Sequence, residues 1–168
     1  HEYQWSVIAE HPSIIASYLW NTFDFAVPMW GRGGVPARNL KGLVTFDRKI
    51  KKDSYFWYKA NWSKEPVLYL TQRRNVNREK KETTVTVYSN IGTPKVYLNG
   101  KELTGIRKGY TDVHYVFDKV TLESGKNILK ATVSSGGKED TDEMEWMYNG
   151  EMKREADFYE NQKEHAGW

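Results

Sequence analysis

The 168-residue sequence contains no cysteine, which excludes disulfide bonds and thiolate chemistry from this chain. It has no apolar run near the roughly 20 residues that a membrane-spanning helix needs, so we expect no membrane partner. Neither sign of charge dominates, because 25 basic residues stand against 22 acidic ones along the whole length. With a net charge of only +3, spread along the chain, the composition gives little reason to expect a nucleic-acid partner.

Patterns for metals and cofactors are missing as well. The four histidines lie far apart, at positions 1, 11, 114 and 165, and do not suggest a set of ligands. We therefore predict neither a metal nor a cofactor. The sequence starts at His1 without the basic and apolar regions of an export signal. On its own it leaves the cellular compartment open.

The first part of the sequence, up to about residue 62, is rich in Trp and Phe. Residues 2–10 have a helical pattern that stops at His11-Pro12. Residues 14–19 form a continuous apolar run, which is typical of a strand buried on both faces in a parallel sheet.

A loop and a second helix are predicted next. Residues 26–40 contain several glycines and prolines and predict a loop, and loops of this length on a rigid scaffold often line a site. Residues 54–62 predict a helix with an apolar covering, and Asp53 precedes it as a candidate N-cap.

Short strands are predicted from residue 67 onward. They cover residues 67–71, 83–88, 95–98, 110–117, 127–133 and 143–148. Asn99-Gly100 is the strongest hairpin signal, because this pair tolerates the positive φ of a type I′ turn. About seven strands at this spacing predict an antiparallel β-sandwich of immunoglobulin type.

Two charged segments complete the pattern. A basic run in a predicted loop is expected to be solvated; it consists of Arg73, Arg74, Arg78, Lys80 and Lys81. Residues 149–168 form a charged tail in which Met152, Ala156 and Tyr159 are spaced as on one stripe of a helix.

Two segments resemble a known enzyme family. Residues 18–25, Tyr-Leu-Trp-Asn-Thr-Phe-Asp-Phe, and residues 39–49, which begin Asn-Leu-Lys-Gly, resemble the end of the catalytic barrel in glycoside hydrolase family 2, the retaining β-galactosidases and β-glucuronidases. A whole (β/α)₈ barrel needs roughly 250 residues. The resemblance therefore implies that residues 1–62 are the C-terminal remnant of such a barrel, its last strand and helix. The fold class that we expect is mainly β, with an immunoglobulin-like antiparallel β-sandwich at residues 66–148 after the remnant.

By this resemblance, Trp20 forms the floor of a sugar site, and its peptide bond is often cis in the family. An indole plate suits the C–H face of a pyranose. The local sequence alone favours a core side chain at a strand end for Trp20, and the surrounding motif reverses this preference. Asn21 and Asp24 follow it as further substrate-binding candidates. A buried carboxylate is costly unless it is hydrogen-bonded, so Asp24 either orients neighbours in the site or caps a loop.

The segment Asn39-Leu40-Lys41-Gly42 resembles the pair that grips the sugar carboxylate in the β-glucuronidases. Lysine supplies a point charge and asparagine an amide donor, which suits a uronate. Similar segments occur in β-galactosidases of the family, where they need not contact substrate, and there Lys41 would order the loop. Further along, we expect Asp47 and Arg48 to form a structural pair.

No catalytic residue is assigned to this chain. Retaining glycosidases need two carboxyl groups about 5–5.5 Å apart, and in the family both are glutamates on earlier barrel strands. Glu2 and Glu10 lie in the helical segment and lack the family's flanking residues. The resemblance implies a C-terminal fragment, inactive alone, of a β-galactosidase-type enzyme that acts on terminal β-linked sugars in glycans. A β-glucuronidase-type parent is the alternative.

The expected partners are a carbohydrate substrate in the intact enzyme and the N-terminal remainder of the parent chain. A remnant without its barrel neighbours exposes sheet edges and aromatic surface. We therefore expect it to be sticky, to form a homo-oligomer or to pack on the sandwich. Analogy with exported polysaccharide-degrading members implies a periplasmic or extracellular parent. A hypothesis from another class is a non-catalytic carbohydrate-binding or structural module, with a stacking platform of Tyr69, Tyr88, Tyr97, Tyr110 and Tyr115.

Overall fold

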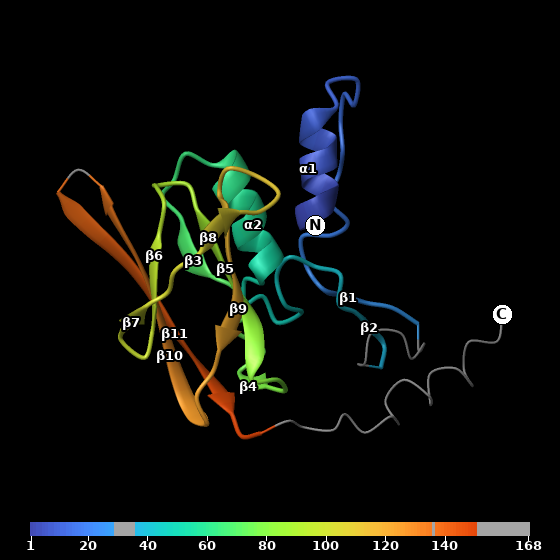
Figure 1. Ribbon diagram of the computed structural model, residues 1–168. Helices are drawn as coiled ribbons and strands as arrows, with labels where there is room; N and C mark the ends of the chain where they lie inside the picture. Colours follow the sequence, from blue (N-terminus) through green and yellow to red (C-terminus); the bar gives the residue numbers. More distant parts are fainter. Residues whose placement is uncertain (29–35, 136, 151–168) are drawn as a thin grey trace. The chain divides into compact units, whose positions relative to one another are not determined.

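The computed structural model of the chain describes residues 1–28, 36–135 and 137–150. Figure 1 shows the order of its helices and strands. These residues form two compact units. Among the described residues, the first unit combines His1–Ile15 with the chain from residue 53 to residue 150, and the second is formed by Ala16–Lys52.

Two β-sheets make up most of the first unit (Figure 1). The five-stranded sheet contains, in spatial order, β4 (Asn77–Arg78), β11 (Lys138–Tyr148), β10 (Gly125–Ser135), β6 (Lys95–Leu98) and β7 (Lys101–Glu102). The four-stranded sheet contains β3 (Leu68–Leu70), β5 (Glu82–Ser89), β9 (His114–Thr121) and β8 (Ile106–Lys108). Neighbouring strands are antiparallel, except that β4 runs parallel to β11. The predicted fold class, mainly β with an antiparallel sandwich, is confirmed.

The hydrophobic core of this unit is built by both sheets. Val85 and Val87 of β5 are fully buried, and so are Leu129 of β10 and, nearly, Trp146 of β11. Every second residue of a strand points to the same face, so the alternation read in the sequence directs one face of each sheet into the core. Complete burial of such a side chain contributes roughly 1.5–3 kcal/mol.

The predicted hairpin after β6 is confirmed. Asn99 and Gly100 both have positive φ, at 49° and 82°, as a type I′ turn requires. The turn leads into β7, which pairs antiparallel with β6. The Asn99 side chain also fixes the turn to the next strand, because its Oδ1 accepts a hydrogen bond of 2.8 Å from the backbone N–H of Ile128.

Helix α2 (Asp53–Trp62) packs against the four-stranded sheet, and it matches the helix predicted at residues 54–62 except that it begins one residue earlier. Its most deeply buried residue is Trp57, whose ring centroid lies 5.2 Å from that of Tyr88 and 5.3 Å from that of His114. The sequence predicted an apolar covering for this helix but did not single out Trp57 as its most buried residue, because several of its neighbours are aromatic too.

Asp53 ties the start of α2 to the sheet. We expected its carboxylate to cap the helix. Instead, its two recorded hydrogen bonds are donated by the Tyr69 hydroxyl and the Gln72 backbone N–H, both at 2.7 Å. Burial, reinforced by the bond to Asp53, raises the pKa of Tyr69 above its usual range. The side chain therefore holds two segments together rather than one helix end.

Helix α1 (Glu2–Glu10) ends before His11-Pro12, as predicted. Its first residue contacts the sheet: the Glu2 carboxylate accepts a hydrogen bond from the Tyr88 hydroxyl and lies 3.7 Å from Nε2 of His114. Burial lowers the pKa of His114, and the neighbouring Glu2 carboxylate opposes this shift.

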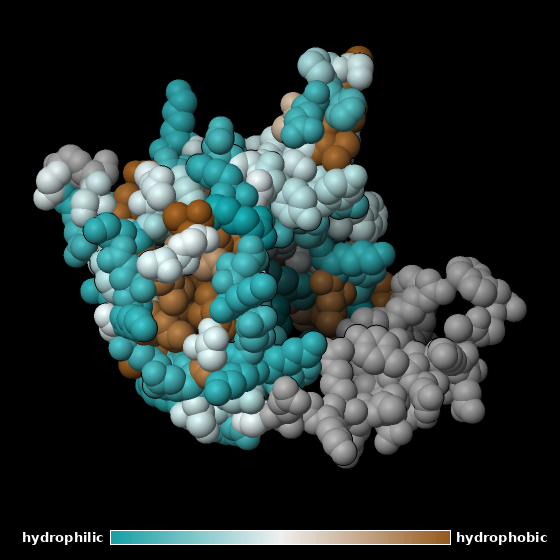
Figure 2. Space-filling view, in the orientation of Figure 1, coloured by the Kyte–Doolittle hydropathy of each residue, from teal (hydrophilic) through white to brown (hydrophobic). Residues whose placement is uncertain are grey.

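The strand predicted at residues 14–19 does not form. These residues have no regular structure, and the Ile15 and Tyr18 side chains are 99% and 93% exposed. A parallel strand is stabilised by hydrogen bonds to strands on both sides, and within the described residues no strand pairs with this segment. Figure 2 shows brown, hydrophobic surface in the region where Figure 1 draws α1 and the segment after it.

Part of the basic run is structural rather than solvated. Arg73 forms an ion pair with Asp142 of β11 and donates to the carbonyl oxygen of Leu70 at 3.1 Å. The guanidinium of Arg78 lies over the Trp146 ring, 4.2 Å from its centroid. Burial lowers the pKa of Arg78 from its ordinary value. Partners more than 60 residues away along the chain are not visible in the local pattern that suggested a free loop.

The tyrosines proposed as a stacking platform do not share one exposed surface. Tyr69, Tyr88 and Tyr115 are buried, whereas Tyr110 is 50% exposed and lies before β9. Strand β9 itself starts at His114, later than predicted, because the preceding residues turn from β8 into β9. Three buried rings cannot stack on a sugar, so the platform is not supported.

Three further expectations are not tested by this fold. The helical tail, residues 149–168, lies outside the described residues from residue 151 onward. The domain division, with a barrel remnant at residues 1–62 and a sandwich at residues 66–148, stays a prediction, and so does homo-oligomer formation.

Asn90 supplies a test of how α2 is joined to β3. Its Oδ1 accepts a hydrogen bond of 2.7 Å from Val67 N–H, and its Nδ2 donates to the carbonyl oxygens of Ser63 and Glu65. Asn90→Ala leaves the buried Val67 amide without this partner, so we expect the free energy of unfolding to fall by about 1–3 kcal/mol. Chemical denaturation measures this change. Asn149→Ala at an exposed position is the control, and equal stability of the two variants would contradict the assignment.

Candidate functional site

The two segments that resemble the enzyme family lie side by side in the second unit. Strand β1 (Phe25–Ala26) pairs antiparallel with β2 (Arg38–Asn39). Next to this pair, the backbone N–H of Asp24 donates to the carbonyl oxygen of Val44 at 2.9 Å. All five predicted site residues belong to this unit; they are Trp20, Asn21, Asp24, Asn39 and Lys41.

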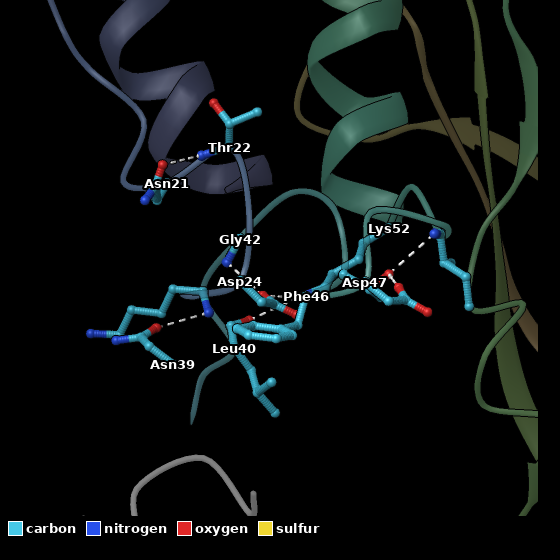
Figure 3. Close-up of polar contacts among 12 residues, drawn as sticks. Asn21, Thr22, Asp24, Asn39, Leu40, Gly42, Phe46, Asp47 and Lys52 are labelled. Carbon is cyan, nitrogen blue, oxygen red and sulfur yellow. Dashed lines mark hydrogen bonds and ion pairs between the residues drawn. The ribbon is translucent and has the colours of Figure 1, made fainter. Parts of the chain in front are cut away.

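Asp24 is the centre of the hydrogen bonding in this unit (Figure 3). Only 2% of the residue is exposed. Its Oδ1 accepts a hydrogen bond of 2.9 Å from the Gly42 backbone N–H and forms an ion pair of 2.6 Å with the Lys52 ammonium. The structure therefore supports the role of orienting neighbours, because the carboxylate joins segments that are 18 and 28 residues away.

Gly42 makes this contact possible. A Cβ atom at this position would lie 2.1 Å from the backbone carbon of Phe23 and 2.1 Å from the backbone nitrogen of Asp24. Real Cβ atoms essentially never come this close to backbone, so the two segments approach each other only because residue 42 has no side chain.

Asn39 and Lys41 differ in how their side chains are used. Asn39 Oδ1 accepts a hydrogen bond of 3.0 Å from the Lys41 backbone N–H, which makes Asn39 a loop-ordering residue. The Lys41 side chain is exposed, and among the described residues its recorded hydrogen bond is made by its backbone. The Lys41 ammonium is therefore available to bind a group that does not belong to the described part of the chain.

Trp20 presents an open aromatic face. The side chain is 71% exposed, and its contact with Phe25 is edge-on, with ring centroids 6.0 Å apart. The peptide bond between Trp20 and Asn21 is cis, as the family resemblance implied. Asn21 Oδ1 accepts a hydrogen bond of 2.6 Å from Thr22 N–H, so Asn21 serves the local backbone.

Lys52 is a structural member of the site that the sequence reasoning missed, and Arg48 has partners other than the expected one. Arg48 was expected to pair with Asp47, but its guanidinium lies 4.2 Å from the Phe23 ring centroid and donates to the Asp24 carbonyl oxygen at 3.2 Å. Asp47 instead accepts from the Thr45 hydroxyl and the Lys49 N–H, and these bonds lower its pKa. No local sequence pattern indicates that Lys52 pairs with Asp24, because the two residues are 28 positions apart.

The described residues contain no helix long and apolar enough to cross a membrane. They also contain no group of three or more His, Asp or Glu side chains suited to a metal ion.

The close approach at Gly42 leads to a direct test. Gly42→Ala places a methyl group against the backbone of Phe23 and Asp24, so we expect the two segments to separate. Overpacking of this kind costs about 1–3 kcal/mol or more. Amide hydrogen exchange of peptides covering residues 20–26 and 38–46 should accelerate strongly. Leu40→Ala on the same segment is the control, and unchanged exchange in Gly42→Ala would contradict the geometry.

Comparisons with known proteins found similar sequences and structures that carry the names of glycosidases. A β-glucuronidase of Bacteroides fragilis is 39% identical over 145 residues, which are 86% of this chain and 21% of that protein. A solved structure from Bacteroides fragilis, provisionally named a β-galactosidase, is 80% identical with a TM-score of 0.89, and the match covers 94% of this chain and 23% of that one. An FMN-binding β-glucuronidase of Faecalibacterium prausnitzii L2-6 is 40% identical with a TM-score of 0.75, covering 88% of this chain and 22% of that one.

No protein-family model matches the sequence. The chain spans only 21% of the length of the first of these relatives, and it matches a C-terminal portion of them. Its homologues are therefore glycosidases of the β-glucuronidase and β-galactosidase type, similar to glycoside hydrolase family 2, as the two sequence segments indicated.

Proposed function

We propose that this chain is part of a retaining glycoside hydrolase that removes terminal β-linked sugars from glycans, and that its second unit forms one wall of the sugar pocket. The observation that carries this proposal is that the segment 39–42 is bound to the buried carboxylate of Asp24, four residues after the exposed Trp20. The names of the homologues support the same reaction class.

In this proposal, the chain binds and orients the sugar, while the reaction itself uses two carboxyl groups on other parts of the intact enzyme. One acts as a nucleophile that forms a glycosyl-enzyme intermediate, and the other acts as acid and then as base. The Trp20 indole, which is largely exposed, offers an apolar plate for the C–H face of the ring and an N–H donor for one oxygen. The sandwich has an accessory role, and we propose that it is of the immunoglobulin-like type.

Because this proposal places the two catalytic carboxyl groups on other parts of the intact enzyme, we predict that the 168-residue chain is inactive alone. We expect no hydrolysis of chromogenic β-galactoside or β-glucuronide by this chain, and clear hydrolysis of at least one of them by the full-length protein that contains it. Product absorbance measures both. Turnover by the isolated chain would contradict the proposal and require a carboxylate pair among residues that we regard as structural.

A second candidate function, cleavage of β-glucuronides in particular, is favoured by Lys41. Its ammonium is exposed on a segment whose backbone is fixed by Asn39, and no carboxylate among the described residues neutralises it. A uronate carboxylate is a suitable partner for such a point charge. If the enzyme is instead of the β-galactosidase type, Lys41 only orders its loop, and its charge is not used in substrate binding.

Lys41→Met in the full-length protein separates these two readings. If Lys41 binds a carboxylate, we expect KM for the β-glucuronide to rise roughly 10- to 100-fold, which is the loss of about 1.5–3 kcal/mol for a hydrogen bond to a charged group. Steady-state kinetics on both glycosides measures this. Equal effects on the β-glucuronide and the β-galactoside would contradict carboxylate recognition and leave the broader glycosidase proposal intact.

A further inference from the structure

We propose that the buried ion pair of Asp24 and Lys52 is a positioning element that fixes the backbone on both sides of Lys41, and thereby aims the Lys41 ammonium at the carboxylate of a uronate substrate. This inference rests on the proposed function. It adds two residues that contact no substrate themselves and act through a third.

The first step of the argument is the geometry around Lys41. The carbonyl oxygen of the residue before it, Leu40, accepts a hydrogen bond of 2.9 Å from the Lys52 ammonium. The N–H of the residue after it, Gly42, donates to Asp24 Oδ1 at 2.9 Å. The two members of a single ion pair therefore bind the two peptide groups that flank Lys41.

The second step concerns burial. The side chains of Lys52 and Asp24 are 15% and 3% exposed, and their charged atoms are 2.6 Å apart. Exposed ion pairs contribute little, but a pair withdrawn from water is held in one geometry and is costly to break, because removal of one partner leaves an unpaired buried charge. The peptide groups on either side of Lys41 are thus attached to a rigid point.

The third step separates the roles of the two lysines. The Lys52 ammonium already binds the Asp24 carboxylate and the Leu40 carbonyl oxygen, so its charge is used within the protein. The Lys41 side chain is exposed, and its backbone N–H is held by Asn39. Both peptide groups that join residues 40 to 42 are therefore fixed, and the exposed lysine side chain extends from between them.

The fourth step is energetic. A flexible lysine loses side-chain and backbone freedom when it binds a substrate, and this loss weakens binding. A backbone that is fixed beforehand removes part of that cost. A displacement of a substrate-positioning group by about 1 Å can cost on the order of 100-fold in rate. The pair should therefore matter for substrates that use the Lys41 charge and much less for those that do not.

The test is Lys52→Met in the full-length protein, assayed with chromogenic β-glucuronide and β-galactoside. Methionine keeps much of the side-chain length but leaves Asp24 unpaired and the Leu40 carbonyl oxygen without its donor. We expect KM for the β-glucuronide to rise roughly 10- to 100-fold, with a small change in kcat and little change for the β-galactoside. Lys52→Arg, which keeps the charge, should restore part of the loss.

Two comparisons make the result specific. Lys49→Met removes an exposed lysine three residues away whose recorded hydrogen bond is made by its backbone, and it should have little effect. In the Lys41→Met background, Lys52→Met should add little further loss on the β-glucuronide, because the positioned group is already gone. Equal losses on both glycosides, or additive losses in the double variant, would overturn the inference, since a merely structural role predicts both.

Failure of the proposed function gives a different result. If the unaltered full-length protein hydrolyses neither glycoside, the proposed function fails, and hydrogen exchange at the Gly42 amide then decides whether the pair fixes this segment. Faster exchange in Lys52→Met supports the positioning role, whereas unchanged exchange overturns it. If the unaltered protein hydrolyses only the β-galactoside, the glycosidase proposal stands and the aiming of Lys41 at a uronate is overturned.

Discussion

The second unit depends on one buried carboxylate. Among its described residues only Leu43 and Val44 are buried hydrophobic side chains, so it has almost no apolar core of its own. A segment this short cannot bury enough apolar surface to hold its loops in place. Asp24 compensates by binding Gly42 and Lys52, and through Lys52 the Leu40 carbonyl oxygen. Hydrogen bonds and an ion pair with Asp24 therefore hold these loops in the place of hydrophobic packing.

The first unit is stabilised in a different way. Its two sheets share a continuous hydrophobic core, and polar side chains act at the margins. Asp53 and Asn90 illustrate this, because both join the ends of α2 to neighbouring segments through backbone and hydroxyl groups. In a core of this kind each side chain makes many small contacts, so the two sheets do not depend on any one polar group. The second unit has no such core, so loss of the contacts made by Asp24 should be felt throughout it.

The sequence predicted what depends on local pattern and missed what depends on distant partners. Alternation located most sandwich strands, and Asn99-Gly100 located a turn whose two residues need positive φ. The run at residues 14–19 was misread, because an apolar run specifies burial but not the neighbours that provide it. Within the site, family resemblance identified Asp24, yet its partner Lys52 lies 28 residues away and has no local signal. Asp47 and Arg48 are adjacent in sequence but bind different groups, so adjacency was a poor guide to pairing.

The ion pair between Asp24 and Lys52 raises the question of why a charged pair is used where an apolar one would serve stability. Two charges withdrawn from water gain little net stability, and well-packed apolar side chains of similar size often do as well or better. An apolar pair, however, could not accept the Gly42 N–H or donate to the Leu40 carbonyl oxygen. These two hydrogen bonds are directional, so they fix the orientation of the peptide groups around Lys41. A fixed orientation is needed if the exposed lysine is to bind a charged group at a defined position. If the segment served only to close a loop, a hydrophobic contact would suffice and the orientation of the peptides around Lys41 would be immaterial. The cost of burying the pair is therefore better explained by the conformation it specifies than by the stability it adds.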